Sequence, residues 1–245
     1  MKIASVLCLV SLLTVSTAHA TTWISVEPVA DPVRSGATCP VKSVVTWGAY
    51  VYNWPSKYDQ VFFPRTDPDG IWFCPKSGFT AFIGDFELTP KEKAAVTTEL
   101  ATFYKPISKP SLSDKLVLLE KSYAGRNQNA RDKVSLLRVL AYYHETDLKD
   151  FDGAAAFRRK ALDMIEAALA TDLPAADRMQ YLFVSAVYHR EFGDLEKSNA
   201  RAKLLEQALK QYQGEELAGY VEYLTGLSKE IDKIAPGGRL VPGEP

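Results

Sequence analysis

The sequence predicts an α+β protein, in which a small β-rich head closed by a disulfide precedes antiparallel α-helical hairpins. Three observations predict this fold class. All four tryptophans lie in the first third of the chain, and twelve Phe, Tyr and Trp residues fall between Trp47 and Phe86. From Thr89 onward, the apolar residues follow a helical period instead. Cys39 and Cys74 both lie in the early part, and each is followed by proline.

The first twenty residues have the pattern of a secretory signal peptide. Lys2 supplies the positive charge, and residues 3–15 form an apolar run. That run is too short to span a bilayer as a helix, which argues against the alternative of an uncleaved membrane anchor. Ala-His-Ala at 18–20 matches a cleavage site, so the mature chain is expected to begin at Thr21 and to be periplasmic or secreted. No stable membrane insertion is expected.

The charge balance excludes some classes of partner. Loss of Lys2 with the signal leaves 28 basic residues against 30 acidic ones, a net charge of −2. Nucleic acids and anionic membrane surfaces are bound by strongly basic surfaces, so neither is expected as a partner. The chain is 47% hydrophobic, which is enough to bury a core in one large domain or two small ones.

Cys39 and Cys74 are the two cysteines that remain after cleavage of the signal. An even number in an exported chain favours a disulfide between them. Closing a loop of this span should stabilise the fold by about 3–4 kcal/mol. A catalytic dithiol is the alternative, but such pairs usually have C-x-x-C spacing, so a static bridge is preferred.

Residues 21–88 are expected to form the β-rich head. Asp67 and Asp69 lie in a turn signal at residues 66–70. As an alternative, these two carboxylates could together bind a metal ion, although acidic residues beside a turn proline commonly bind none. Runs of aromatic and β-branched residues predict strands at 44–47, 49–52, 61–63 and 71–73.

Residues 89–235 are expected to be helical. Thr89 precedes Pro90 as an N-cap, and this helix should end before Pro106. Ser111 or Ser113 caps the next helix. A disordered tail is expected at 236–245. Apolar periodicity predicts further helices at residues 129–147, 151–170, 174–192, 195–212 and 215–234.

Two of the predicted helical hairpins repeat one another. The segment at residues 139–144 recurs at 184–189, and each copy is followed by a turn containing Asp and Gly and then by a Lys-Ala-Leu or Gln-Ala-Leu segment. This order resembles the tetratricopeptide repeat, in a loose and slightly stretched form. The resemblance implies helical hairpins that stack side by side.

The complete order of motifs resembles a bacterial family known as a domain of unknown function, with two CPxC knuckles ahead of a helical tail. The resemblance covers about residues 38–235, and in the family the four knuckle cysteines look like a zinc ribbon. Here Lys42 and Ser77 replace the second cysteine of each knuckle. Zinc would then need His144 or His189 as further ligands, so no metal and no cofactor is expected.

The expected function is that of a non-enzymatic scaffold in the cell envelope, which binds an unknown protein or peptide. No oligomeric state is predicted. The alternative is an envelope hydrolase or carbohydrate-binding protein that uses the aromatic head, for example Trp47, Trp54 and Trp72, but no catalytic signature accompanies these residues. The candidate binding surface comes from equivalent positions of the two repeats: Tyr143, His144, Tyr188 and His189.

Overall fold

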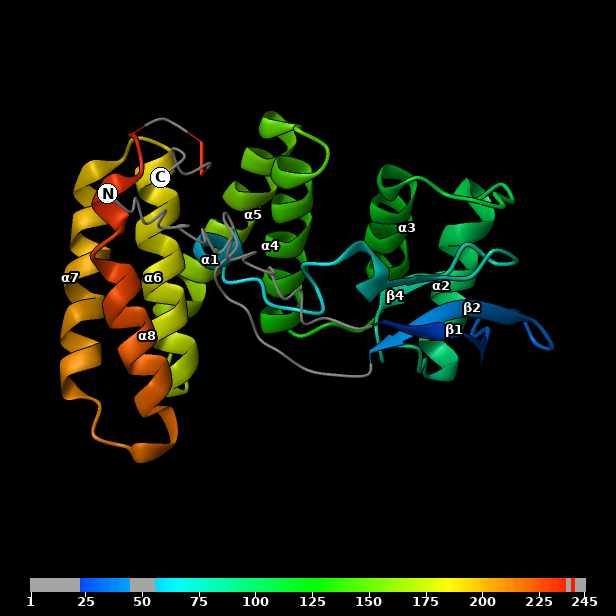
Figure 1. Ribbon diagram of the computed structural model, residues 1–245, viewed down its shortest axis with the longest axis horizontal. Coiled ribbons are helices and arrows are strands. Elements are labelled where there is room, and N and C mark those ends of the chain that lie inside the picture. The colour runs from blue at the N-terminus through cyan, green and yellow to red at the C-terminus, as the bar shows by residue number, and fades with distance from the viewer. Residues whose placement is uncertain (1–22, 45–55, 237–238, 241–245) are drawn as a thin grey trace, which may run out of the picture.

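The computed structural model describes residues 23–44, 56–236 and 239–240. The predicted signal peptide, the mature start at Thr21, the strand at 49–52 and all but Val44 of the strand at 44–47 lie outside these residues. Within them the fold is α+β, as the sequence predicted. Two small antiparallel sheets lie at one end of the molecule, and helices make up the remainder (Figure 1).

Two short hairpins make up the head. The strand β1 (Trp23–Ala30) pairs with β2 (Thr38–Val44), and β3 (Ile71–Phe73) pairs with β4 (Thr80–Phe82). The turn predicted ahead of β3 is a 3-10 turn, η1 (Pro68–Gly70). The indole Nε1 of Trp72 donates to the carbonyl of Lys42 over 2.9 Å, which joins the two sheets.

The strand predicted at residues 61–63 is wrong. A short helix, α1 (Ser56–Asp59), comes just before it, and the following backbone turns instead of extending. The N–H of Val61 donates to Ser56 and that of Arg65 to Phe62, each over 2.9 Å, so these groups are satisfied locally and not in a ladder. Pro64, which follows a cis peptide bond, has no N–H to donate to a partner strand.

Five of the described helices begin at a side-chain cap, and the sequence predicted the caps of the first two. Thr89 and Ser111 each form a reciprocal capping box, so the helix after residue 110 is capped by Ser111 and not by Ser113. Asn129, Asp150 and Asp194 also cap helices with their side chains. The helices are α2 (Pro90–Phe103), α3 (Leu112–Ala124), α4 (Ala130–Thr146), α5 (Phe151–Leu169), α6 (Ala175–Glu191) and α7 (Leu195–Gln211).

The last predicted helix, at residues 215–234, is divided into three pieces: η2 (Glu215–Leu217), α8 (Ala218–Ser228) and η3 (Ile231–Lys233). Two glycines inside α8 lower its helix propensity, and tight i to i+3 bonds follow it. These turns bring Ile231 and Ile234 into the core beside α6.

Part of the predicted disordered tail also has a defined place. Leu240 is 1% exposed, and the guanidinium of Arg239 lies 3.6 Å from the centre of the Phe151 ring. Both residues therefore pack against the helical region, which differs from the expected disorder of residues 236–245.

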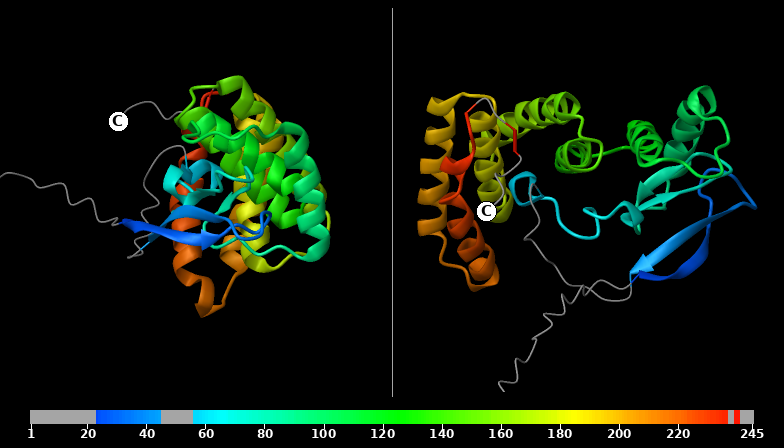
Figure 2. Two further views of the ribbon diagram at one scale, coloured as in Figure 1. Left: turned by 90° about the vertical axis from the view of Figure 1, so that its right-hand side faces the viewer. Right: turned by 45° about the horizontal axis from the view of Figure 1, so that its top comes forward.

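The helices follow one another along the long axis of the molecule. The α6, α7 and α8 helices lie at the end away from the head, α4 and α5 lie in the middle, and α2 and α3 lie beside the sheets (Figures 1 and 2). One hydrophobic core joins the head to α2, α3 and one face of α4. A second core joins α5 to α8, and Tyr58 of α1 belongs to it.

Among the described residues, we find no helix with both the length and the apolar character needed to cross a membrane.

Candidate functional site

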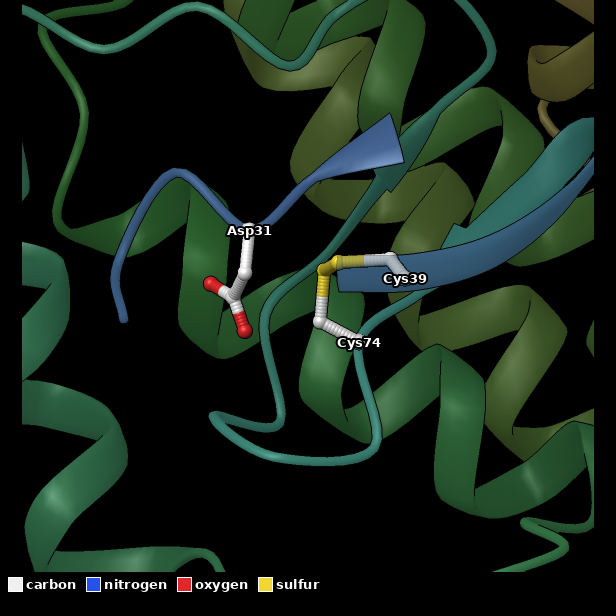
Figure 3. Close-up of side chains that lie close together, drawn as sticks. All are labelled: Asp31, Cys39 and Cys74. Carbon is white, nitrogen blue, oxygen red and sulfur yellow. A yellow bond between two sulfur atoms is a disulfide. The ribbon is translucent and has the colours of Figure 1, made fainter. Parts of the chain in front are cut away.

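Cys39 and Cys74 lie at disulfide distance, as the sequence predicted. Their sulfur atoms are 1.94 Å apart, and both residues are completely buried. Cys39 comes from β2 and Cys74 follows β3, so the bridge joins the two sheets of the head. The carboxylate of Asp31 lies beside the bridge (Figure 3).

The residues in place of the knuckle cysteines have structural partners. The ammonium group of Lys42 lies 2.6 Å from a carboxylate oxygen of Asp69. The hydroxyl of Ser77 donates to Asp31 over 3.1 Å and accepts the N–H of Phe79. Asp31, Cys39 and Cys74 place their ligand atoms within 4.8 Å of one another. Sulfur atoms bonded to each other carry no thiolate, so this group does not supply the four ligands of a structural zinc site.

Tyr143 and Tyr188 do not lie on a binding surface, which corrects the expectation from the sequence. Both are fully buried: Tyr143 belongs to the core shared with the head, and Tyr188 to the core of α5 to α8. His189 is also buried, whereas the side chain of His144 keeps 19% of its surface exposed. The proposed surface therefore retains His144 as its one partly exposed member.

The two histidines instead stabilise equivalent hairpin turns. His144 Nδ1 lies 2.8 Å from Asp150, the N-cap of α5, and His189 Nδ1 lies 3.8 Å from Asp194, the N-cap of α7. In both turns, the N–H of the capping Asp donates to the histidine carbonyl over 2.8 Å. The residue before each Asp has a positive φ. The repeat in the sequence thus corresponds to a repeated turn.

His189 also belongs to a polar group on the face of α6 toward α5 and α7. Glu166 accepts from Ser185 over 2.5 Å, lies 3.3 Å from His189 Nε2, and forms an ion pair with Arg201. Burial alone would raise the pKa of Glu166, but hydrogen bonds from Arg201 and Ser185 hold it below its usual value. Both carboxylate oxygens of Glu166 therefore contact neighbouring side chains, so these residues form a structural network.

A second polar group is fully buried where α1, α4, α5 and α6 meet. Arg158 of α5 is 1% exposed, and its guanidinium donates to Asp59 twice, over 2.9 and 2.7 Å. The same guanidinium donates to Glu191 over 2.8 Å and to Glu145. The hydroxyl of Tyr188 donates to Asp59 over 2.6 Å. We call these five residues the Arg158 cluster.

The Arg158 cluster holds one cation for three carboxylates. Burial raises the pKa of Glu191 to about 7, and it raises the pKa of Glu145 as well. Burial alone would lower the pKa of Arg158, but Asp59 and the two glutamates hold it well above its usual value. One oxygen of each glutamate has no hydrogen-bond partner among the described residues. A proton on the glutamates would relieve the excess negative charge in this buried place.

A cleft of about 410 Å³ lies next to this cluster, between the segment after α1 and the helices α4 and α6. Its apolar wall comes mainly from Val61, Phe62, Phe63, Pro64, Val139 and Tyr181. Its polar wall contains Arg65, Arg131, Asp132, Ser135, Arg138 and Gln180. Gln60 also lies in the polar wall, so polar groups make up at least half of the lining, and the volume lies in the range usual for ligand sites.

Arg138 is the unusual member of the cleft. It is 6% exposed and donates to the side-chain oxygen of Gln180 over 2.9 Å and to the carbonyl of Gln60 over 2.7 Å. Its Nε has no partner among the described residues, nor does any described carboxylate form an ion pair with it. Burial lowers the pKa of Arg138, and neighbouring groups that include the Asp59 carboxylate offset this only in part.

Comparison of the chain with protein-family models, with curated proteins and with solved structures found no match. The resemblance to a two-knuckle family therefore stays a prediction. Fold and site together define an α+β protein with a disulfide-linked head, helical hairpins and a cleft lined by arginine.

Sequence reasoning missed both the Arg158 cluster and the cleft. A signal for each was present in the helical period. Arg158 shares one apolar face of α5 with Ala154, Ala161 and Ile165, and Arg138 has Val134 and Tyr142 at four residues on either side. A charged residue within an apolar stripe is expected to be buried with polar partners.

Proposed function

We propose that this chain is a non-enzymatic binding protein of the cell envelope, and that it binds a peptide or a protein segment in the cleft between the segment at residues 60–65 and the helices α4 and α6. The cleft is the observation that carries the proposal. It is open enough to admit a side chain or chain end, and its wall combines aromatic, aliphatic and cationic groups.

The hairpins α4–α5 and α6–α7 support the scaffold part of the proposal. Their turns share the Asp cap, the positive φ before it and the histidine contact. We propose that they are TPR-like repeats, which commonly present binding surfaces between neighbouring hairpins. The cleft lies where the first of these hairpins meets the second, on the side of α4 and α6.

An extracytoplasmic location is part of the same proposal. A disulfide in the head is compatible with an oxidising compartment, where such bridges form and persist. The apolar run at 3–15 and the Ala-His-Ala sequence at 18–20 supply the export signal in this proposal.

The geometry gives less support to a hydrolase or a carbohydrate-binding head. His144 and His189 are each engaged in a hairpin turn, and neither lines the cleft. Trp72 uses its Nε1 to bind Lys42 and packs edge-on against Phe86, so it fills a structural role in the head. Trp47 and Trp54 lie outside the described residues.

A peptide-selection experiment tests the proposal. Mature protein would be immobilised and exposed to a random peptide library, next to the variant Ser135→Trp, whose indole would fill the cleft. Ser113→Trp, at an exposed position of α3, is the matched control. We expect peptides to be enriched by the wild type and by Ser113→Trp, but not by Ser135→Trp. Equal enrichment on all three proteins, or none on the wild type, would refute the proposal.

A further inference from the structure

We propose that the cleft recognises a carboxylate, carried by an organic acid with an apolar body or by the C-terminus of a peptide, and that Arg138 and Arg65 bind it. This inference rests on the proposed binding function and names the chemistry of the ligand. It starts from the charges that line the cleft.

Two arginines of the cleft lack an ion pair among the described residues. Arg65 donates to the hydroxyl of Ser135 over 2.6 Å and lies over the Phe82 ring at 4.7 Å, but it contacts no described carboxylate. Arg138 is held by two neutral oxygens, of Gln180 and Gln60. A buried guanidinium such as that of Arg138 normally has an anionic partner, and the partly exposed Arg65 adds a second cation that an anion in the cleft can contact.

The two guanidinium groups face the same space. Ser135, which accepts from Arg65, lies three residues before Arg138 on α4, and residues at this spacing share one face of a helix. Arg65 therefore reaches the helix face that carries Arg138. The unpaired Nε of Arg138 gives this group a remaining donor.

The charge balance of the site favours a monoanion. Arg65, Arg131 and Arg138 bring three positive charges, and Asp132 brings one negative charge. Arg131 is paired with Asp177 over 3.0 Å, which removes one further charge. A net charge of +1 remains, which fits a carboxylate better than a dianionic phosphate group. The planar guanidinium also matches a carboxylate geometrically.

The other residues of the cleft determine what kind of group can accompany the carboxylate of the ligand. Phe62, Phe63 and Tyr181 offer aromatic surface beside the arginines. A ligand that places its carboxylate at Arg138 would therefore have these rings in the same cleft to contact its apolar body. The volume of about 410 Å³ is large enough for the apolar body of a small ligand together with its carboxylate.

Matched acid and amide probes test this inference. Isothermal titration calorimetry on the mature protein would compare 3-phenylpropionate with 3-phenylpropionamide, and a tripeptide ending in phenylalanine with its C-terminal amide. We expect each acid to bind at least about tenfold more tightly than its amide, since a hydrogen bond to a charged group contributes about that much. Binding of the small acid alone would identify a free organic acid as the source, and binding of the peptide acid a peptide C-terminus.

Variants separate recognition from folding. Arg138→Gln and Arg65→Gln should each weaken binding of the acids by about tenfold or more and leave binding of the amides unchanged. Arg178→Gln, on an exposed position of α6 outside the cleft, is the matched control and should have no effect. Arg65 lies in the segment between α1 and η1, so its variant tests the idea even if Arg138→Gln fails to fold.

Several outcomes would overturn the carboxylate proposal. These are equal affinity for acid and amide, no binding of any probe, an equal loss of affinity in Arg178→Gln, or stronger competition by inorganic phosphate than by acetate. If the peptide selection described above succeeds while acid and amide bind alike, the binding function stands and the carboxylate inference falls. If neither experiment detects binding, both the binding function and the carboxylate inference are refuted.

Discussion

Arg158 is surrounded by three carboxylates, and all four side chains are buried. Asp59, Glu145 and Glu191 come from three different elements, and the guanidinium contacts all of them. Assembling such a group costs desolvation that attraction offsets only in part. Removing its single cation would leave carboxylates buried with no counter-charge, which is the more costly change.

Arg158→Met should therefore destabilise the protein by about 3–5 kcal/mol. Urea unfolding followed by circular dichroism would measure the change. Arg159→Met is the matched control, since the neighbouring arginine is exposed, and it should cost less than about 1 kcal/mol. Equal losses in the two variants would show that the Arg158 cluster does not stabilise the fold.

The raised pKa of Glu191, about 7, predicts a pH dependence of stability. Between about pH 4.5 and 7 the folded chain keeps a proton that the unfolded chain releases. The contribution of Glu191 to the free energy of unfolding should therefore be largest below this window and be lost as the pH rises through it. Burial is the main cause of the raised pKa; Arg158 lowers the pKa of Glu191, whereas the neighbouring charges of Asp59 and Glu145 raise it.

Glu191→Gln should reduce the loss of stability that accompanies rising pH. The amide oxygen can still accept from Arg158, and the NH₂ group replaces an oxygen that has no described partner. We expect the variant to match the wild type near pH 4.5 and to exceed it at pH 8, by on the order of 1–3 kcal/mol. Glu196→Gln, at an exposed position, is the control. Parallel stability curves for wild type and Glu191→Gln would contradict the assignment.

At the scale of elements, the turn after β3 fixes the head onto α2. Gly78 has φ +77°, its N–H donates to Cys74, and a Cβ added there would lie 2.4 Å from the Tyr104 ring. That ring cannot easily move away, because the Tyr104 hydroxyl donates to Pro75 over 2.8 Å and accepts from Ile107 over 3.1 Å. Gly78 is therefore required both for its backbone conformation and for its lack of a side chain.

Gly78→Ala should destabilise the protein by more than about 2 kcal/mol, through backbone strain and the clash together. Gly36→Ala isolates the first of these causes. Gly36 has φ +73°, but a Cβ there meets nothing within 4 Å, so about 1 kcal/mol is expected. Thermal and urea unfolding of the two variants would give the difference. Equal losses would mean that contact with Tyr104 contributes nothing.

The helices were predictable because their ends are set by local chemistry. Thr89, Ser111, Asn129, Asp150 and Asp194 cap helices at the predicted starts, since a capping side chain acts within three residues of itself. The segment at 61–63 was not predictable in this way. Its aromatic and β-branched residues suit a strand, but the burial of Val61 in the core shared with α4 and the local turns at Pro64 decide its backbone.

The candidate site was less predictable still, because it depends on contacts between distant parts of the sequence. The carbonyl of Gln60 accepts from Arg138, 78 residues later, and Arg138 in turn contacts Gln180, 42 residues further on. No local pattern reports such contacts. The cysteine pair is the exception, since the even number of cysteines and the expected export together predicted it.

At the scale of the whole molecule, α1 attaches the N-terminal part of the chain to the core of α5 to α8. Tyr58 packs in the core of α5 to α8, Asp59 binds Arg158, and Lys57 pairs with Glu230 over 2.6 Å. The other core also crosses the boundary predicted at residue 88, because Phe79 and Phe82 of the head pack with Val96 and Leu119. The helical region thus completes both of its cores with residues from before residue 88.

These contacts predict how fragments of the chain behave. A fragment of residues 89–245 lacks Asp59, Tyr58 and the head side chains that cover α2 and α3, so it should lose cooperative unfolding or melt far below the full mature chain. A fragment of residues 56–245 with Cys74→Ala keeps all of these except the β1–β2 hairpin, and should unfold cooperatively at an intermediate temperature. Circular dichroism melts and NMR peak dispersion of the three proteins would decide. If the 89–245 fragment melts cooperatively at the temperature of the full chain, the helices form an independent domain, and neither α1 nor the head is needed to complete their cores.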